Sequence, residues 1–219
     1  MSLRLIVTNI CKSYNGKPVL NDCSVSFESG GIYALMRPNG SGKSTFLRIC
    51  SFLENPDKGE IKYFSEENFL KNNIELRRKI TLVLPKAGIF NTTVFKNAAY
   101  GLSIRGAGKE EIEEKVSKIL NFTGLAHKRN HNALTLSSGE TQRLGIARAM
   151  VIEPDVLFLD EPTASVDQEN TEIIENIILD LKKTGRSIVI VATHDTIQAE
   201  RFSDKVLILR NGRFFEINP

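Results

Sequence analysis

Apolar and polar residues alternate in the first part of the chain, with the period of two that is typical of half-buried strands. Residues 3–8 alternate imperfectly, whereas residues 23–28 alternate cleanly and end at a Ser-Gly-Gly turn. Cys23 lies on the apolar side of this second segment. A thiol in that position is expected to behave as a small buried hydrophobe. The pattern therefore predicts strands with Cys23 in their core.

A third apolar run, residues 32–36, leads into a glycine-rich stretch. After Thr45 the apolar residues recur at helical spacing as far as Asn55 and Pro56. An Asn-Pro pair is a strong stop signal for a helix. This part of the chain is therefore expected to run strand, glycine loop, helix.

The rest of the chain combines two apolar patterns. Residues 109–120 and 168–182 carry apolar residues along one helical face. Three short apolar runs lie at residues 156–159, 187–191 and 205–209. Short apolar runs that alternate with helices indicate buried parallel strands. The pattern predicts an α/β fold.

Composition and charge limit the class of protein. The chain has 219 residues, of which 41% are hydrophobic and 25% charged, so one large domain or two small lobes are expected. A net charge of +3 is too small to argue for a nucleic-acid partner. No apolar run approaches the roughly 20 residues that cross a bilayer, and the N-terminus does not resemble a signal peptide. We expect a cytosolic chain, with any membrane-spanning part on another chain.

Cysteine and histidine do not suggest a metal centre. The three cysteines are far apart, so neither a disulfide framework nor a zinc site is supported. His127 and His131 are four residues apart in the stretch HKRNH, which has no nearby Cys or carboxylate. A solvated basic loop is the expected reading of that stretch.

The glycine-rich stretch RPNGSGKST, residues 37–45, is the first candidate for chemistry. Backbone N–H groups of Gly40, Gly42 and Lys43 would point at phosphate oxygens at the start of the following helix. Lys43 would reach the outer phosphates, and the Ser44 hydroxyl would ligate Mg²⁺. A glycine turn that merely precedes a helix is the alternative when this stretch is taken alone.

The stretch VLFLDEP, residues 156–162, adds two acids at the end of a predicted buried strand. Ligands of open α/β sheets bind at the carboxyl ends of the strands. Asp160 can hold a metal ion there, and Glu161 can polarise an attacking water. Two solvated acids at a strand end are the alternative, and the glycine loop upstream makes it much weaker.

A third stretch, LSSGETQRLGIARAM, begins with a Ser/Gly turn and continues as an apolar-periodic helix, residues 136–150. The exposed N–H groups at such a helix start form a second anion site. The chain therefore carries two candidate phosphate sites.

Together, RPNGSGKST, LSSGE, VLFLDEPTASVD and VATHD, in the order of their positions along the chain, resemble the motifs of the ATP-binding subunits of ABC transporters. The resemblance covers nearly the whole chain. In that family two subunits pack head to tail, and ATP lies between the phosphate loop of one and the signature motif of the other. The resemblance thus implies that the two phosphate sites serve different nucleotides.

The resemblance also implies roles for individual residues. Tyr14 matches the aromatic residue that stacks on adenine. The residues that match the phosphate loop are Asn39, Gly40, Ser41, Gly42, Lys43, Ser44 and Thr45. The residues that match the signature are Ser137, Ser138, Gly139 and Glu140. Asp160 matches the metal-binding acid, Glu161 the catalytic base, Asp167 the loop that couples the two sites, and His194 the switch histidine.

The implied fold is a P-loop NTPase, RecA-like core with an N-terminal antiparallel β subdomain and a small helical subdomain. Residues 1–86 and 136–219 would form the ATP-binding lobe, and residues 87–135 the helical lobe. The implied cofactors are ATP and Mg²⁺. The implied partners are a second copy or a paired ATP-binding subunit, and transmembrane permease subunits, on the inner face of the cell membrane. Residues 91–106 look similar to subunits of oxyanion or metal-ion importers.

Four positions depart from the family pattern. A metal-reaching glutamine is expected after residues 80–84, where Pro85 stands, and the chain's only glutamines are Gln142, Gln168 and Gln198. Arg37 replaces the first glycine of the phosphate loop. Because Pro38 follows, residue 37 is expected to have an extended backbone, which arginine adopts without strain. The signature has Ser138 for glycine and Glu140 for glutamine, changes that are expected to be mild.

Two functional readings follow. The first is a motor subunit that hydrolyses ATP to drive a separate permease, which Glu161 and His194 favour. The second is a nucleotide-gated dimerising module with weak or no hydrolysis, which Arg37 and Pro85 favour. A DNA-repair or ribosome-associated ATPase of the same superfamily fits less well, because the chain has neither long coiled-coil insertions nor tandem ATP domains.

Overall fold

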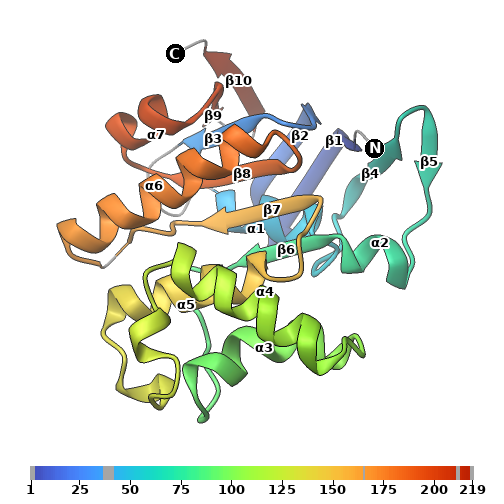
Figure 1. Cartoon of the computed structure of the whole chain (residues 1–219). Helices are drawn as coiled ribbons and strands as arrows, with labels where there is room; N and C mark the ends of the chain where they lie inside the picture. The colour runs from blue at the N-terminus through green and yellow to red at the C-terminus, as the bar shows by residue number, and fades with distance from the viewer. Residues whose placement is uncertain (1–2, 37–41, 165, 211–212, 218–219) are drawn as a thin grey trace. The chain divides into compact units, whose positions relative to one another are not determined.

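The alternating N-terminal segments fold into an antiparallel sheet of four strands, in the order β2-β1-β4-β5 (Figure 1). Its strands are β1 Leu3–Tyr14, β2 Lys17–Glu28, β4 Lys58–Ser65 and β5 Asn68–Leu70. Cys23 is fully buried on β2, which confirms its expected place. Burial raises the pKa of its thiol to about 11.

This is a computed structural model, and it describes residues 3–36, 42–164, 166–210 and 213–217. The chain divides into two compact units. The first comprises residues 1–82, 155–161 and 181–219, and the second residues 83–154 and 162–180. These limits differ from the lobe boundaries expected from the motifs, and that functional division stays a prediction.

The short apolar runs form a six-stranded sheet in the order β10-β9-β3-β8-β7-β6. Its strands are β3 Ile32–Met36, β6 Ile80–Val83, β7 Val156–Asp160, β8 Ile188–Thr193, β9 Lys205–Arg210 and β10 Arg213–Ile217. β3 pairs in parallel with β8 and β9, and β7 pairs in parallel with β8. β3, β7 and β8 are buried along their whole length. The expected parallel strands of an α/β core are thus confirmed.

Helix α1, Lys43–Cys50, follows β3 and buries Phe46, Leu47 and Ile49 in the core of the first unit. That core also takes residues from both sheets. The helix ends earlier than the apolar spacing predicts. Phe52 adopts a left-handed backbone with φ of 58°, and the N–H of Leu53 bonds back to the carbonyl of Arg48. This C-terminal turn stops the helix before Pro56 can do so. The first unit also contains the short helices α2, Ile74–Arg78, and α7, Thr196–Phe202.

The second unit is helical. Its helices are α3 Val94–Ile104, α4 Lys109–Phe122, α5 Ser138–Met150 and most of α6 Gln168–Thr184, with short 3-10 turns at Ala126–Lys128 and Ala133–Thr135. α4 and α6 match the two predicted helices closely. Val94, Val116 and Leu144 are among the residues that fill a core between α3, α4 and α5. The unit therefore has a hydrophobic core of its own.

Candidate active site

The carboxyl ends of three neighbouring parallel strands bring the candidate residues of the first unit to one edge of the sheet. Met36 at the end of β3 lies opposite Thr193 at the end of β8, and Asp160 at the end of β7 lies opposite Ala192. The residues that follow each strand therefore meet at this edge, where α/β sheets bind their ligands.

Helix α1 begins at this edge with Gly42 as its N-cap. Gly42 has φ of +95°, and a Cβ added there would lie 2.8 Å from Val19 Cγ1. Among the residues that the structure describes, no side chain caps the helix, and its first turn contains no acid. The start of α1 thus carries backbone N–H groups and the positive end of a helix dipole without a side-chain anion of its own. Residues 37–41 lie outside the described residues, which includes Arg37 and the phosphate-loop candidates Asn39, Gly40 and Ser41.

Glu161 joins two other predicted site residues. Its Oε1 lies 3.0 Å from Lys43 Nζ, and its Oε2 lies 2.8 Å from His194 Nδ1. Lys43 is almost fully buried, whereas His194 is exposed. Oε1 is buried without an aligned hydrogen bond among the described residues, so its contact with Lys43 is an ion pair maintained by charge. The three predicted catalytic residues are thus in contact.

The backbone of Glu161 is left-handed, with φ of 48°, and its N–H donates to the carbonyl of Ala192. A side chain other than glycine, asparagine or aspartate is uncommon in this conformation. Such strained positions cluster at functional sites, where the surrounding structure maintains them. The turn directs the carboxylate of Glu161 toward Lys43 and His194 while Asp160 completes β7.

Asp160 and Ser44 form the candidate metal site. Burial raises the pKa of the Asp160 carboxyl, a hydrogen bond with the Ser44 side chain lowers it, and the neighbouring carboxylate of Glu161 raises it. Asp160 Oδ1 is buried and has no hydrogen-bond partner among the described residues. A buried, unpartnered carboxylate oxygen beside a hydroxyl is a donor set that suits Mg²⁺, which prefers a few oxygen ligands and keeps several waters.

Tyr14 lies at the end of β1, with its ring partly exposed. Burial, followed by a hydrogen bond with Glu54, raises the pKa of its hydroxyl, and a hydrogen bond with Thr45 lowers it. Lys12 Nζ lies 5.6 Å from the centre of the ring. The structure therefore brings Tyr14, with a partly exposed ring, to the first turn of α1.

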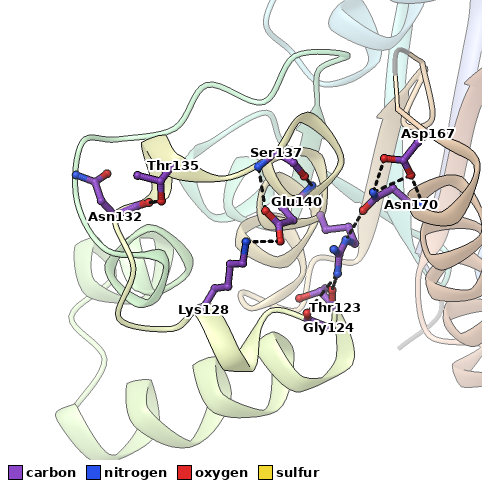
Figure 2. A network of polar contacts seen from close by, with 10 residues as sticks. Thr123, Gly124, Lys128, Asn132, Thr135, Ser137, Glu140, Asp167 and Asn170 are labelled. Atoms are coloured by element: carbon purple, nitrogen blue, oxygen red, sulfur yellow. Dashed lines mark hydrogen bonds and ion pairs between the residues drawn. The ribbon is translucent and has the colours of Figure 1, made fainter.

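In the second unit, α5 begins quite differently. Ser137 is the N-cap, its Oγ accepts from the N–H of Glu140 at 3.2 Å, and Glu140 Oε2 accepts from the N–H of Ser137 at 2.9 Å. This reciprocal pair is a capping box. Ser138 is exposed, and Gly139 is buried. Glu140 Oε1 lies 2.7 Å from Lys128 Nζ (Figure 2).

A polar chain fastens this helix to the start of α6. Arg143 Nε donates to Asn170 Oδ1 at 3.0 Å, and Arg143 Nη1 donates to the carbonyl of Thr123 at 2.8 Å. Asn170 Nδ2 donates to both carboxylate oxygens of Asp167, at 2.8 and 3.0 Å (Figure 2). A Cβ on Gly139 would lie 2.2 Å from Asn170 Cγ, so only glycine fits there. Asn170 thus contacts Gly139, Arg143 and Asp167.

Sequence reasoning missed Asn170 and Lys128. Asn170 had no motif of its own, although an amide three residues after Asp167 is well spaced to bond it at a helix start. The reading of HKRNH as a solvated loop was incomplete. His127 and His131 are exposed, but Lys128 pairs with Glu140, and Arg129 pairs with Glu113 at 2.6 Å.

Pro85 follows β6 by two residues and is partly exposed. The carbonyl of the preceding residue, Leu84, accepts a long hydrogen bond of 3.5 Å from Gln142 Nε2. The glutamine nearest to this turn therefore already has a partner in the second unit, and the ring of Pro85 offers no ligand.

Comparison with known proteins decides the family. The family model described as ABC transporter matches residues 20–164, about two thirds of the chain. The chain is an ATP-binding subunit of the ABC transporter family. It is 39% identical to the tungstate uptake system ATP-binding protein TupC of Peptoclostridium acidaminophilum, over 98% of both chains.

Two further relatives extend this likeness. The subunit is 34% identical to the phosphate import ATP-binding protein PstB 2 of Natronomonas pharaonis, over 98% of its own length and 80% of the relative. A dimeric ATP-binding cassette solved in a post-hydrolysis state with ADP and Pi matches with a TM-score of 0.85 and 27% identity, over 98% of each chain.

These findings confirm the family and the fold expected from the motifs. The ABC subunit has an α/β P-loop NTPase core with an N-terminal antiparallel sheet and a helical part. It is an ATPase of a family that drives transport. Within its described residues, no helix combines the length and apolar character that crossing a membrane requires.

Proposed function

We propose that the edge formed by β3, β7 and β8 binds the phosphates of ATP with Mg²⁺ and hydrolyses the outer phosphate. The observation that carries this proposal is the contact of Glu161 with both Lys43 and His194, beside the buried unpartnered oxygen of Asp160. A buried cation, a carboxylate and a metal-ligand pair at one strand edge are the parts that phosphoryl transfer requires.

Lys43 exchanges partners in this proposal. In the structure its ammonium pairs with Glu161. Phosphate oxygens carry more charge than one carboxylate, and they also accept hydrogen bonds from the backbone N–H groups at the start of α1. When phosphate binds, Lys43 turns to it, and Glu161 becomes the proton acceptor that polarises an attacking water. His194 stays within reach of Glu161 and of the outer phosphate, so its ring orients both.

Ser44 and Asp160 would hold Mg²⁺, Ser44 through its hydroxyl and Asp160 through Oδ1. Bound there, the ion would neutralise charge on the phosphate oxygens during transfer. Tyr14 offers its exposed ring face to the adenine. Asn39, Gly40, Ser41 and Thr45 complete the phosphate loop in this proposal.

The start of α5 serves a second copy of the chain. Ser137, Ser138, Gly139 and Glu140 would contact the nucleotide held at the α1 start of the partner. The similar dimeric cassette with ADP and Pi supports a dimer of this kind. The family supports membrane-spanning permease chains as the other partners, with this subunit peripheral on the inner face of the membrane.

We further propose that the cargo is an oxyanion. Tungstate and phosphate are tetrahedral oxyanions, and the two relatives named for their uptake or import match the chain over 98% of its length. Cells that lack the subunit should lose uptake of one oxyanion, and the parent chain but not Lys43→Ala should restore it. Restored uptake of an uncharged or cationic solute alone would contradict this assignment.

The direct test of the catalytic proposal is phosphate release by the purified chain with ATP and Mg²⁺. Release that depends on Mg²⁺ and disappears in Lys43→Ala is expected. ATP-dependent dimers without phosphate release would instead support a nucleotide-gated module, the reading that Pro85 and Arg37 favour.

A further inference from the structure

We propose that Lys128 cancels the charge of Glu140 and so keeps the start of α5 able to accept a phosphate. Lys128 is thereby a positioning residue of the signature, acting through Glu140 rather than by touching the nucleotide. The inference rests on the proposed function, because it assumes that the α5 start receives the nucleotide of a second copy.

Glu140 is a negative charge inside an anion site. It occupies the third position of α5, next to Gly139, where the related motif has a neutral glutamine. Burial would raise the pKa of its carboxyl, but the hydrogen bond with Lys128 and that from the N–H of Ser137 lower it overall. Glu140 is therefore ionised at neutral pH, and an ionised carboxylate repels an approaching phosphate.

The same carboxylate stabilises its own helix. Oε2 accepts from the N–H of Ser137, which completes the capping box, and the negative charge suits the positive end of the helix dipole. A glutamine can make the same backbone contact without the charge. Glutamate in place of glutamine therefore disfavours phosphate binding, through charge repulsion, and does not destabilise the helix.

Lys128 is placed to remove that cost. Its Nζ lies 2.7 Å from Glu140 Oε1, the oxygen that the capping box does not use. The backbone of Lys128 is fixed on both sides, since its N–H donates to the carbonyl of Leu125 and its own carbonyl accepts from the N–H of His131. Its side chain is 27% exposed and that of Glu140 14%, so water screens this pair less than a surface pair.

The other nearby cation is committed elsewhere. Arg143 lies within electrostatic range of Glu140, but its Nε and Nη1 donate to Asn170 and to the carbonyl of Thr123. Burial lowers the pKa of Arg143, and its side chain would have to break these hydrogen bonds to reach Glu140. Lys128 is therefore the direct partner of Glu140 among the described residues.

The experiment measures ATP-driven dimers by sedimentation velocity, with Glu161→Gln in every chain so that bound ATP is not consumed. Lys128→Ala should raise the ATP concentration at half-dimerisation by about tenfold, because an uncompensated carboxylate then faces the phosphate. Adding Glu140→Gln to Lys128→Ala should restore the parent value. Salt should shrink the Lys128→Ala effect, because the Debye length falls from about 10 Å at 0.1 M to about 3 Å at 1 M.

Lys118→Ala is the matched control, since it removes a lysine of the same unit whose partner Glu114 is exposed. It should leave the half-point unchanged. A Lys128→Ala defect that Glu140→Gln does not rescue would overturn the inference and make Lys128 a structural anchor. An unchanged half-point in Lys128→Ala would overturn it as well. Absence of dimers in the parent background would instead overturn the proposed function itself.

Discussion

The starts of α1 and α5 are both proposed to meet phosphate, yet they are built in opposite ways. α1 begins at a left-handed glycine with no side-chain cap and no acid in its first turn, and Lys43 follows at once. α5 begins with a closed capping box and contains Glu140 in its first turn. One helix start is open to an anion, and the other already contains one.

This difference suggests a division of labour. An uncapped helix start has N–H groups without intrahelical partners, so it gains most from a tightly held phosphate. A self-capped helix start is stable without a ligand, so it can remain folded before a second chain binds. Binding should therefore depend on α1, and assembly of the dimer on α5.

Lys43→Ala should have the largest effect of these variants, because it weakens ATP binding at the start of α1. It removes the cation that reaches the outer phosphates, and a loss of roughly 100-fold in ATP affinity is expected. Titration of the chain with a fluorescent ATP analogue measures the effect. Lys62→Ala, a change at an exposed lysine of the same unit, serves as control and should bind like the parent. Unchanged affinity in Lys43→Ala would falsify the phosphate-loop assignment.

Glu161→Gln should separate binding from chemistry at the same helix start. The amide keeps the shape but no longer accepts a proton, so turnover should fall by roughly 100-fold or more while ATP still binds. The chain should also change from a transient to a stable dimer with ATP. Phosphate release and light scattering report the two results, and hydrolysis at the parent rate would show that Glu161 is not the base.

Asn170→Ala tests the hydrogen bonds that join α5 to the start of α6. It leaves the buried Nε of Arg143 without its partner and removes the side-chain hydrogen bonds to Asp167, while the N–H at position 170 still donates to Asp167 Oδ1. The free energy of unfolding should therefore fall by about 1–3 kcal/mol. Gln168→Ala, at an exposed position of the same helix, should cost little.

The Asn170 effect should depend on pH. Hydrogen bonds from the backbone N–H and from the side chain of Asn170 lower the pKa of Asp167 below its usual 3.8, and Asn170→Ala removes only the side-chain part. A carboxyl whose pKa is lowered in the folded state stabilises the protein above its unfolded-state pKa. This stabilisation is lost as the pH falls through the folded-state pKa. The gap between parent and Asn170→Ala should therefore narrow in acid below about pH 3.8. Urea unfolding at several pH values checks this, and a gap that widens in acid would argue against the Asp167 contact.

Pro85→Gln should have the smallest effect. The family pattern that the sequence resembles has a metal-reaching glutamine after this strand, so the variant restores that side chain, which would take the place of one water of a Mg²⁺ shell. Since a bridging water is within about 0–2 kcal/mol of a direct contact, only a modest rise in rate or fall in the required Mg²⁺ is expected. Steady-state hydrolysis across a Mg²⁺ series measures it. No change in either quantity would mean that water serves equally well.

The sheet and its edge were predictable from the sequence because both follow local rules. Short apolar runs that alternate with helices, such as residues 156–159, indicate buried strands, and residues that follow neighbouring parallel strands meet at one edge. The family resemblance assigned Asp160, Glu161 and His194 to one site, and Glu161 and His194 are in contact.

Contacts between distant side chains were not predictable in the same way. Nothing in the spacing of Lys128 and Glu140, or of Arg143 and Asn170, shows that their side chains meet. The left-handed turn at Phe52 ends α1 early. Helix propensity alone allows the helix to continue, so this end could not be predicted from the sequence either.

The most direct test of the account mixes two defective chains in the Glu161→Gln background. Lys43→Ala disables the α1 start, and Ser138→Glu adds a charge at an exposed position of the α5 start where the helix itself tolerates an acid. Each alone should remain monomeric with ATP. Mixed, they should form ATP-dependent dimers that contain both chains, since one of the two symmetric sites is then intact. Dimers from either variant alone, or none from the mixture, would contradict the claim that one nucleotide joins the two helix starts of different chains.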